Sequence, residues 1–358
     1  MRFFAAIQSG NHPPLSATNG LDKARERVIA LGKAVDAAWR RIQQLSADVQ
    51  DSYQAVFVAP EFYFVNNQSA HAQDRYLSHD EKRWTIAQLS ALAKTYPRLL
   101  IIPGTVLWTK DVTDSNRDKV KDRIMAAHNQ HQKALPALIK KHEKEYGDAV
   151  EPIVNMQTFN PGYSFTGSAT VPQGSYAPFH YLDNVSNTVI AQNVAYVCKA
   201  DKILKYAKVG NSSELGGNTS NAVFAPGALA GVFSVGNVRY GLEICMDHWV
   251  GVLRHGTSWS PHIHIITSSY TENRTFHFTV VENGLILHSS TEARITPYRL
   301  NGLPDKPPKE ENLGNSLQLF MFDLAIPVTG KANDELHSEG ATGDFEGPLP
   351  AVKHIHTF

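Results

Sequence analysis

Short, uninterrupted apolar runs alternate with long helical patterns in the first part of this chain. The runs lie at residues 3–8, 54–60 and 98–105, and the helical patterns lie at about 21–49 and 80–96. A strand that is apolar at nearly every residue needs cover on both faces of its sheet. The order strand, helix, strand, helix, strand therefore predicts an α/β fold in which helices cover the sheet.

Strand patterns return in the second half of the chain, at residues 187–198, 202–209, 262–269, 284–290 and 316–324. Residues 231–245 predict a hairpin that turns at Gly236 and Asn237. Residues 110–185 contain too few apolar residues for a core of their own, so we interpret them as a helical and loop insertion. We expect one domain over residues 1–330 and a polar tail over 331–358 that is loose or draped over a partner.

The composition narrows the class of protein and its partners. Lysine plus arginine equals aspartate plus glutamate, at 34 each, which argues against a nucleic-acid or anionic-membrane partner. Two cysteines in 358 residues are no disulfide framework and favour a reducing, cytoplasmic location. The first apolar run is too short for a secretion signal, and no run is long enough to span a bilayer.

Cys245 stands where a predicted strand stops, in the stretch VRYGLEICMDHW. A cysteine is a useful nucleophile only as a thiolate, so it needs a base or a positive charge nearby. Most free cysteines are small buried hydrophobes, and Cys198 inside VAYVCK is expected to be one of these. Position alone therefore favours a small buried hydrophobe for Cys245 as well.

Two charged residues occupy similar places at the ends of other predicted strands. Glu61 directly follows the run VFVAP, and Lys208 closes KILKYAK. Taken singly, Glu61 would be expected in an exposed loop and Lys208 on the solvated surface. Taken together with Cys245, they supply a base, a cation and a nucleophile at three strand ends.

These three motifs, in this order, resemble the nitrilase superfamily of carbon–nitrogen hydrolases. The glutamate motif is matched by FVAPEFYF, the lysine motif by KYAKVGNSSEL and the cysteine motif by GLEICMD. The likeness covers nearly the whole chain outside residues 110–185 and the C-terminal tail. It implies a four-layer αββα sandwich that pairs with a second subunit, giving a homodimer or a higher homo-oligomer.

The resemblance also implies a role for each residue of the motifs. Glu61 would be the general base, Cys245 the nucleophile, and Lys208 the cation that stabilises the oxyanion. The backbone N–H of Met246 would be a second oxyanion donor. Glu214 matches a second glutamate that many members of the family carry beyond the lysine, with an ordinary loop acid as the equal alternative.

The residues around the cysteine bear on the substrate. Met246 and Asp247 depart from the Trp-Glu of true nitrilases and resemble the amidase and carbamoylase branches, and Asp247 is expected to be structural. His248 is a candidate substrate contact but a poor candidate base, because adjacent residues point apart. In the insertion, Tyr163 and Phe165 either line a pocket for an apolar substrate or pack the insertion onto the sheet.

We therefore expect a cysteine-dependent hydrolase of a non-peptide amide or carbamoyl bond that acts on a small molecule through a thioester. A nitrilase, an N-acyltransferase, an inactive nitrilase-like binding protein and a cysteine peptidase are the alternatives. No cofactor or metal is expected. His262 and His264 share one face of a predicted strand, but no carboxylate or cysteine companion stands near them in the sequence.

Overall fold

The computed structural model describes residues 1–10, 12, 15–17, 20–47, 53–65, 76–122, 189–209, 222–225, 227, 231–257, 259–271, 273–292, 297–299, 309–325 and 335–338. Most of the predicted insertion and of the predicted tail lies outside these residues. Glu214, Tyr163 and Phe165 lie outside them too, so their predicted roles stay predictions.

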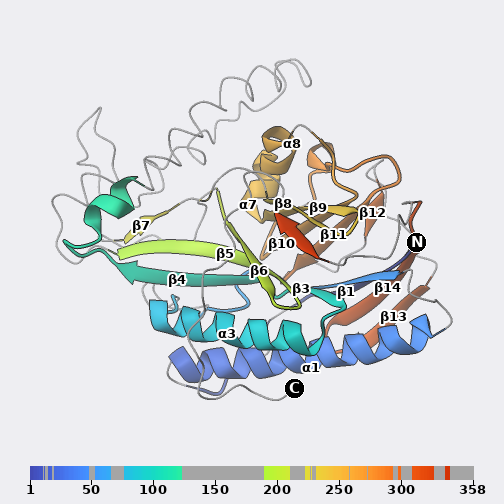
Figure 1. Ribbon diagram of the computed structural model, residues 1–358, viewed down its shortest axis with the longest axis horizontal. Helices are drawn as coiled ribbons and strands as arrows, with labels where there is room; N and C mark the ends of the chain where they lie inside the picture. The colour runs from blue at the N-terminus through green and yellow to red at the C-terminus, as the bar shows by residue number, and fades with distance from the viewer. Residues whose placement is uncertain are drawn as a thin grey trace.

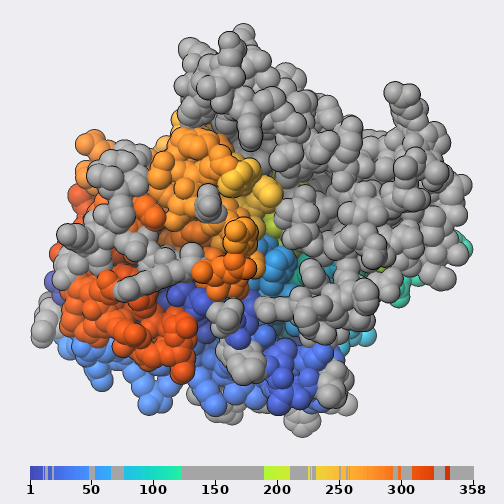
Figure 2. Space-filling view, turned by 180° about the vertical axis from the view of Figure 1, so that it is seen from behind, coloured from blue at the N-terminus to red at the C-terminus, as the bar shows by residue number. Residues whose placement is uncertain are grey.

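The first sheet contains nine strands in the described part of the chain, in the order β13-β14-β1-β2-β3-β5-β4, with β6 and β7 also paired to β5. The strands are β1 (Arg2–Gln8), β2 (Tyr53–Val58), β3 (Leu99–Ile102), β4 (Thr105–Asp111), β5 (Val189–Lys199), β6 (Lys202–Ala207), β7 (Ala222–Phe224), β13 (Lys309–Gly314) and β14 (Leu317–Asp323). In Figure 2 the orange-red β13 and β14 lie beside the blue N-terminal segments, as the antiparallel pairing of β14 with β1 requires.

The second sheet contains six described strands in the order β12-β11-β10-β9-β8-β15. The strands are β8 (Gly231–Val235), β9 (Val238–Ile244), β10 (Ile263–Ser268), β11 (Leu285–Ser290), β12 (Tyr298–Arg299) and β15 (Leu336–Ser338). The predicted hairpin is confirmed, because β8 and β9 pair antiparallel on either side of Gly236 and Asn237. Strands β9, β10 and β11 run parallel, so their carboxyl ends meet at one edge.

Two long helices, α1 (Gly20–Ser46) and α3 (His79–Thr95), cover one face of the first sheet (Figure 1). A capping box fixes the start of α3, because the Ser78 side chain accepts from the Glu81 N–H and the Glu81 carboxylate accepts from the Ser78 N–H. The helices α7 (Met246–Val250) and α8 (Val252–Gly256) lie at the second sheet. Leu253 of α8 packs on Gly241 of β9, where a Cβ would lie 2.4 Å from a leucine methyl carbon.

Alternate residues of the buried strands serve the two cores. In β1, Phe4 and Ala6 pack among the helix-facing residues, whereas Phe3, Ala5 and Ile7 pack against the second sheet. The sequence is apolar on both faces of this strand for that reason. The molecule is therefore a mixed α/β fold of two stacked sheets flanked by helices, which confirms the predicted fold class.

The sequence did not predict strands β7, β12 and β13, and two further strands change its interpretation of residues 98–105 and of the tail. Residues 98–105 are not one strand, because the chain turns at Gly104, with φ of 78°, and continues into β4, which was not expected. A Cβ at Gly104 would lie 2.1 Å from the Pro60 carbonyl oxygen, so the turn requires glycine. Part of the tail is also neither loose nor draped over a partner, because β15 pairs with the edge of β8. Among the described residues, no helix has the length and apolar character needed to cross a membrane.

Leu100→Ala should destabilise the fold by about 2–5 kcal/mol, because Leu100 is fully buried between the sheets and its truncation leaves a cavity. Ile29→Ala, on an exposed position of α1, should change stability by about 0.5 kcal/mol or less. Urea unfolding curves measure both changes, because a shift of the midpoint urea concentration at an unchanged m-value is a change in the free energy of unfolding. Equal midpoints for the two variants would contradict the assignment of Leu100 to the core.

Candidate active site

Glu61 and Lys208 meet in the interior of the protein. Glu61 lies just beyond β2 and Lys208 just beyond β6, and the Lys208 Nζ is 2.9 Å from the Glu61 Oε1. Both side chains are completely buried. Two of the strand ends singled out in the sequence therefore come together as a buried ion pair, rather than as the surface charges that each residue would be on its own.

Further donors fix the Glu61 carboxylate. The Asn193 side-chain amide of β5 donates to Oε1 at 2.9 Å, and the Ser269 N–H donates to Oε2 at 3.0 Å. The Glu61 main chain is held as well, because its carbonyl is 3.0 Å from the His12 Nε2. A buried carboxylate with donors on both oxygens has one orientation, which a general base requires.

Cys245 occupies a strained turn between β9 and α7. Its φ of 48° and ψ of −104° are unusual for a residue with a side chain and cost about 1–3 kcal/mol. A nucleophile on a sharp strand-to-helix turn is presented at the edge of its sheet in many hydrolases. The Cys245 side chain is only partly buried, whereas Cys198 is fully buried, and burial raises the pKa of the Cys198 thiol.

The carboxyl end of β10 connects the cysteine turn to Glu61. The Cys245 N–H donates to the Thr267 carbonyl at 2.9 Å, and the Glu61 N–H donates to the Ser268 carbonyl at 3.2 Å. The next residue, Ser269, donates to the Glu61 carboxylate. Three consecutive residues of one strand end therefore hold both groups, which places the thiol and the carboxylate on neighbouring turns.

Asp247 ties the lysine strand to the cysteine helix. Its carboxylate accepts from the Tyr206 hydroxyl at 2.7 Å and from the Val209 N–H at 3.1 Å. Tyr206 and Val209 bracket Lys208 in the chain, so Asp247 fastens the lysine strand to the turn that begins at Cys245. Burial and the nearby carboxylate raise the pKa of Tyr206 well above its usual value, so its hydroxyl stays a donor. This is the structural role expected of Asp247.

Thr271 is a contact of Cys245 that the sequence did not reveal. Its hydroxyl oxygen lies 2.8 Å from the Cys245 Sγ, at hydrogen-bond distance. Thr271 is nearly buried in the loop after β10. A hydroxyl in this place donates to a thiolate and stabilises it.

The remaining predicted residues are placed as follows. Met246 begins α7 directly after Cys245 and is partly buried. His248 is completely buried, with Nδ1 2.9 Å from the Glu243 Oε2 and Nε2 accepting from the Arg274 N–H at 3.2 Å. Both ring nitrogens of His248 are thus engaged within the protein, and its role as a substrate contact stays a prediction.

Glu243 was missed in the sequence, although it lies only two residues before Cys245. Its carboxylate contacts both His248 and His264, the latter through Nε2 at 2.8 Å. The carboxylate companion of His264 is not near it along the chain, because Glu243 comes from the adjacent parallel strand. The sequence did contain a signal for Glu243. It lies between the inward-facing Leu242 and Ile244, so its carboxylate must lie on the opposite face of β9.

Glu243, His248 and His264 are arranged like three ligands of a metal ion, but their hydrogen bonds fit a different state. The outer ring nitrogens accept backbone N–H groups, from Arg274 to His248 and from Thr279 to His264. The inner nitrogens must then carry the protons that they donate to Glu243. A metal ion would bind the inner nitrogens only without their protons, and the outer nitrogens would then carry the N–H groups. Those N–H groups would face the backbone N–H groups of Arg274 and Thr279, which are donors too. The cluster therefore suits a hydrogen-bond network rather than a metal site.

The charge state of this cluster follows from its contacts. Burial alone would raise the pKa of Glu243, but the imidazole rings of His264 and His248, which donate hydrogen bonds to its carboxylate, lower it to about 2. Burial lowers the pKa of His248. The network therefore holds an ionised carboxylate and a neutral His248 at neutral pH.

No protein-family model matches this sequence, and no curated protein matches it. Among solved structures, the chain is similar to a mutant of the Nesterenkonia AN1 amidase from the nitrilase superfamily, with 12% identity, 90% of each chain covered and a TM-score of 0.42. A complex of that amidase with butyramide gives 13% identity, the same coverage and a TM-score of 0.43. The glutamine-dependent NAD+ synthetase from Acinetobacter baumannii gives 11% identity and a TM-score of 0.45, over 93% of this chain and 49% of that one. At these scores the similarity carries no argument about function.

Thr271→Val should slow the alkylation of Cys245 by iodoacetamide at neutral pH by about threefold to tenfold, because one hydrogen bond to the thiolate is lost without a change of shape. Thr271→Ser keeps the hydroxyl and should react at close to the wild-type rate. Mass spectrometry of the labelled peptide follows Cys245 separately from the buried Cys198. Equal rates for the valine and serine variants would show that the hydroxyl does not stabilise the thiolate.

Acidification below pH 6.5 should destabilise the fold. Burial, with the nearby His248 and His264, lowers the pKa of His288 to about 3, and burial, with Arg27, lowers that of His12 to about 3. Between pH 6.5 and about 3 the unfolded chain therefore binds protons that the folded chain does not. The free energy of unfolding falls by up to about 1.4 kcal/mol per pH unit for each histidine.

Urea unfolding between pH 7.5 and 5 tests this, because the shift of Glu243 acts only at lower pH. His288→Gln removes one of the buried histidines while keeping a polar partner for Ser268, so its pH dependence should be shallower. A variant with the wild-type slope would contradict the assignment.

Proposed function

We propose that this protein is a carbon–nitrogen hydrolase that cleaves a non-peptide amide or carbamoyl bond of a small molecule through a thioester on Cys245. The supporting observation is the buried Glu61–Lys208 ion pair, linked through β10 to the strained Cys245 turn. The motifs that resemble the nitrilase superfamily occur at these same positions. No cofactor enters the proposal.

The first half of the reaction forms the thioester. Glu61 accepts the thiol proton, and the Cys245 thiolate attacks the substrate carbonyl carbon. The Lys208 ammonium and the Met246 N–H stabilise the oxyanion of the tetrahedral intermediate. Glu61 then returns the proton to the leaving nitrogen, the carbon–nitrogen bond breaks, and ammonia or an amine departs.

The second half regenerates the enzyme. Glu61 takes a proton from water, and the resulting hydroxide attacks the thioester carbon. The second tetrahedral intermediate collapses, the carbon–sulfur bond breaks, and the acid is released as Cys245 regains a proton. Lys208 stays charged throughout, which suits its place beside a buried carboxylate.

The proposal extends to the surroundings of the site. Glu214 would support the lysine end of the site, and His248, Tyr163 and Phe165 would be substrate contacts. The resemblance to the nitrilase superfamily implies a homodimer or a higher homo-oligomer. The proposed mechanism needs Cys245 as a free thiol, and the chain has only two cysteines. We therefore place the protein in the cytoplasm, where thiols stay reduced.

A panel of amides, carbamoyl compounds and nitriles, followed by ammonia release, tests the proposed class. Wild type should turn over at least one amide or carbamoyl compound and show an acyl adduct on Cys245 by intact mass. Cys245→Ala should reduce turnover to background while the protein stays folded. Turnover of nitriles alone would replace the amidase assignment with a nitrilase, and activity of the alanine variant would exclude the mechanism.

Glu61→Gln should reduce kcat/KM by about 10²- to 10⁴-fold, because the general base is lost. It also leaves Lys208 without its counter-charge, so circular dichroism must establish that the variant is folded. Glu311→Gln makes the same chemical change in a surface pair with Arg41 and should keep wild-type activity. A folded Glu61→Gln protein with the activity of the Glu311→Gln control would place the base elsewhere.

A further inference from the structure

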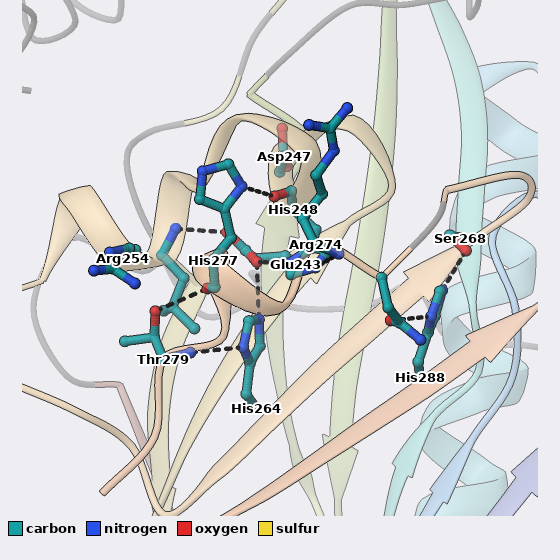
Figure 3. Close-up of polar contacts among 12 residues, drawn as sticks. Glu243, Asp247, His248, Arg254, His264, Ser268, Arg274, His277, Thr279 and His288 are labelled. Carbon is teal, nitrogen blue, oxygen red and sulfur yellow. Dashed lines mark hydrogen bonds and ion pairs between the residues drawn. The ribbon is translucent and has the colours of Figure 1, made fainter. Parts of the chain in front are cut away.

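The Glu243–His248–His264 network surrounds the nucleophile turn without including the nucleophile. Glu243 comes from β9, His248 from α7 and His264 from β10, and all three side chains are completely buried (Figure 3). Cys245 lies in the chain between Glu243 and His248. The contact between the Glu243 Oε2 and the His248 Nδ1 therefore closes a short loop around Cys245.

The Glu243 carboxylate holds three elements at once. One oxygen, Oε2, accepts from the inner nitrogens of His248 and His264 at 2.9 and 2.8 Å. The other, Oε1, accepts from the Leu253 N–H at 2.6 Å, at the first turn of α8. Both helices that follow the nucleophile and the neighbouring strand are thus fastened to one buried charge.

Backbone contacts fix the imidazole rings of His248 and His264 from the side away from Glu243. The Arg274 N–H donates to the His248 Nε2, and the Thr279 N–H lies 3.4 Å from the His264 Nδ1 (Figure 3). His277 is hydrogen-bonded through Nδ1 to the carbonyl of His248 at 2.9 Å. Because each ring has one nitrogen committed to accepting, neither ring can rotate or exchange tautomers without breaking a buried hydrogen bond.

We propose that this network is the positioning device that keeps the Cys245 turn in its strained, reactive conformation. The proposal rests on the proposed function of Cys245 as the nucleophile. A residue with φ of 48° persists only where its surroundings impose that conformation, and the Glu243–His248 contact across the turn does so. Without it the turn relaxes, and the thiol moves away from the Thr271 hydroxyl.

Two substitutions of one residue separate positioning from simple stability. His248→Leu fills much of the space but removes the donor to Glu243. His248→Asn keeps an N–H donor near the position of Nδ1 and removes only the outer nitrogen. The control is His262→Leu, which also removes a ring that accepts a backbone N–H. His262 accepts from the Arg239 N–H of β9 and lies just before the amino end of β10.

In His248→Leu, we expect iodoacetamide alkylation of Cys245 and kcat for the amide substrate each to fall by about tenfold or more. KM should change by less than about threefold, and His248→Asn should recover most of both rates. His262→Leu should lower the Tm by a similar amount and leave both rates unchanged. This pattern supports positioning, because a lost contact that serves stability alone lowers the Tm without slowing the folded enzyme.

Other outcomes overturn the proposal. A folded His248→Leu protein that alkylates at the wild-type rate removes the positioning role, and a raised KM with unchanged alkylation makes His248 a substrate contact instead. A stoichiometric metal in the purified wild type, found by elemental analysis, would make the cluster a metal site. If wild type hydrolyses no amide but His248→Leu still slows alkylation and His248→Asn restores it, the proposed function fails and the positioning role stands.

Discussion

The buried ion pair between Glu61 and Lys208 is the interaction on which the rest of the site depends. Two fully buried charges lose hydration worth several kcal/mol each, and their attraction offsets this only with good geometry and further hydrogen bonds. Asn193 supplies one such bond from the first sheet, and the Ser269 backbone supplies another from the end of β10 in the second sheet. The carboxylate is therefore fully satisfied only after the two sheets have packed together.

Two other buried carboxylates hold the nucleophile turn from opposite sides. Asp247 connects it to the lysine strand of the first sheet, whereas Glu243 connects it to α8 and to His264 on the outer face of the second sheet. Each carboxylate accepts at least one backbone N–H, so each fixes main chain as well as side chains. The strained backbone at Cys245 needs contacts on both sides of the turn. With a contact on one side alone, the turn could move away from it and lose the strain.

The sequence predicted what depends on the apolar pattern along a single strand and failed where contacts cross between strands. The apolar runs predicted β1, β2 and the β8–β9 hairpin, and residues that follow such runs pointed to Glu61, Lys208 and Cys245. Asn193 and Thr271 were missed because each looks like an ordinary polar residue until its partner in another strand or loop is known. Strand β4 was missed because Gly104, which turns the chain into it, was interpreted as part of the end of one strand at residues 98–105.

The relative placement of the two sheets shows why polar contacts decide the geometry of this site. The core between the sheets is built from aliphatic and aromatic side chains whose attraction has little directional preference. Hydrogen bonds do have direction, and they cross the interface at both ends of β2. At its start, Gln54 contacts Val235 and Tyr240, and beyond its end Thr267 donates to the Ala59 carbonyl. The hydrophobic core thus drives the sheets together, and these crossing bonds set the register in which Glu61, beyond the end of β2, meets the carboxyl end of β10.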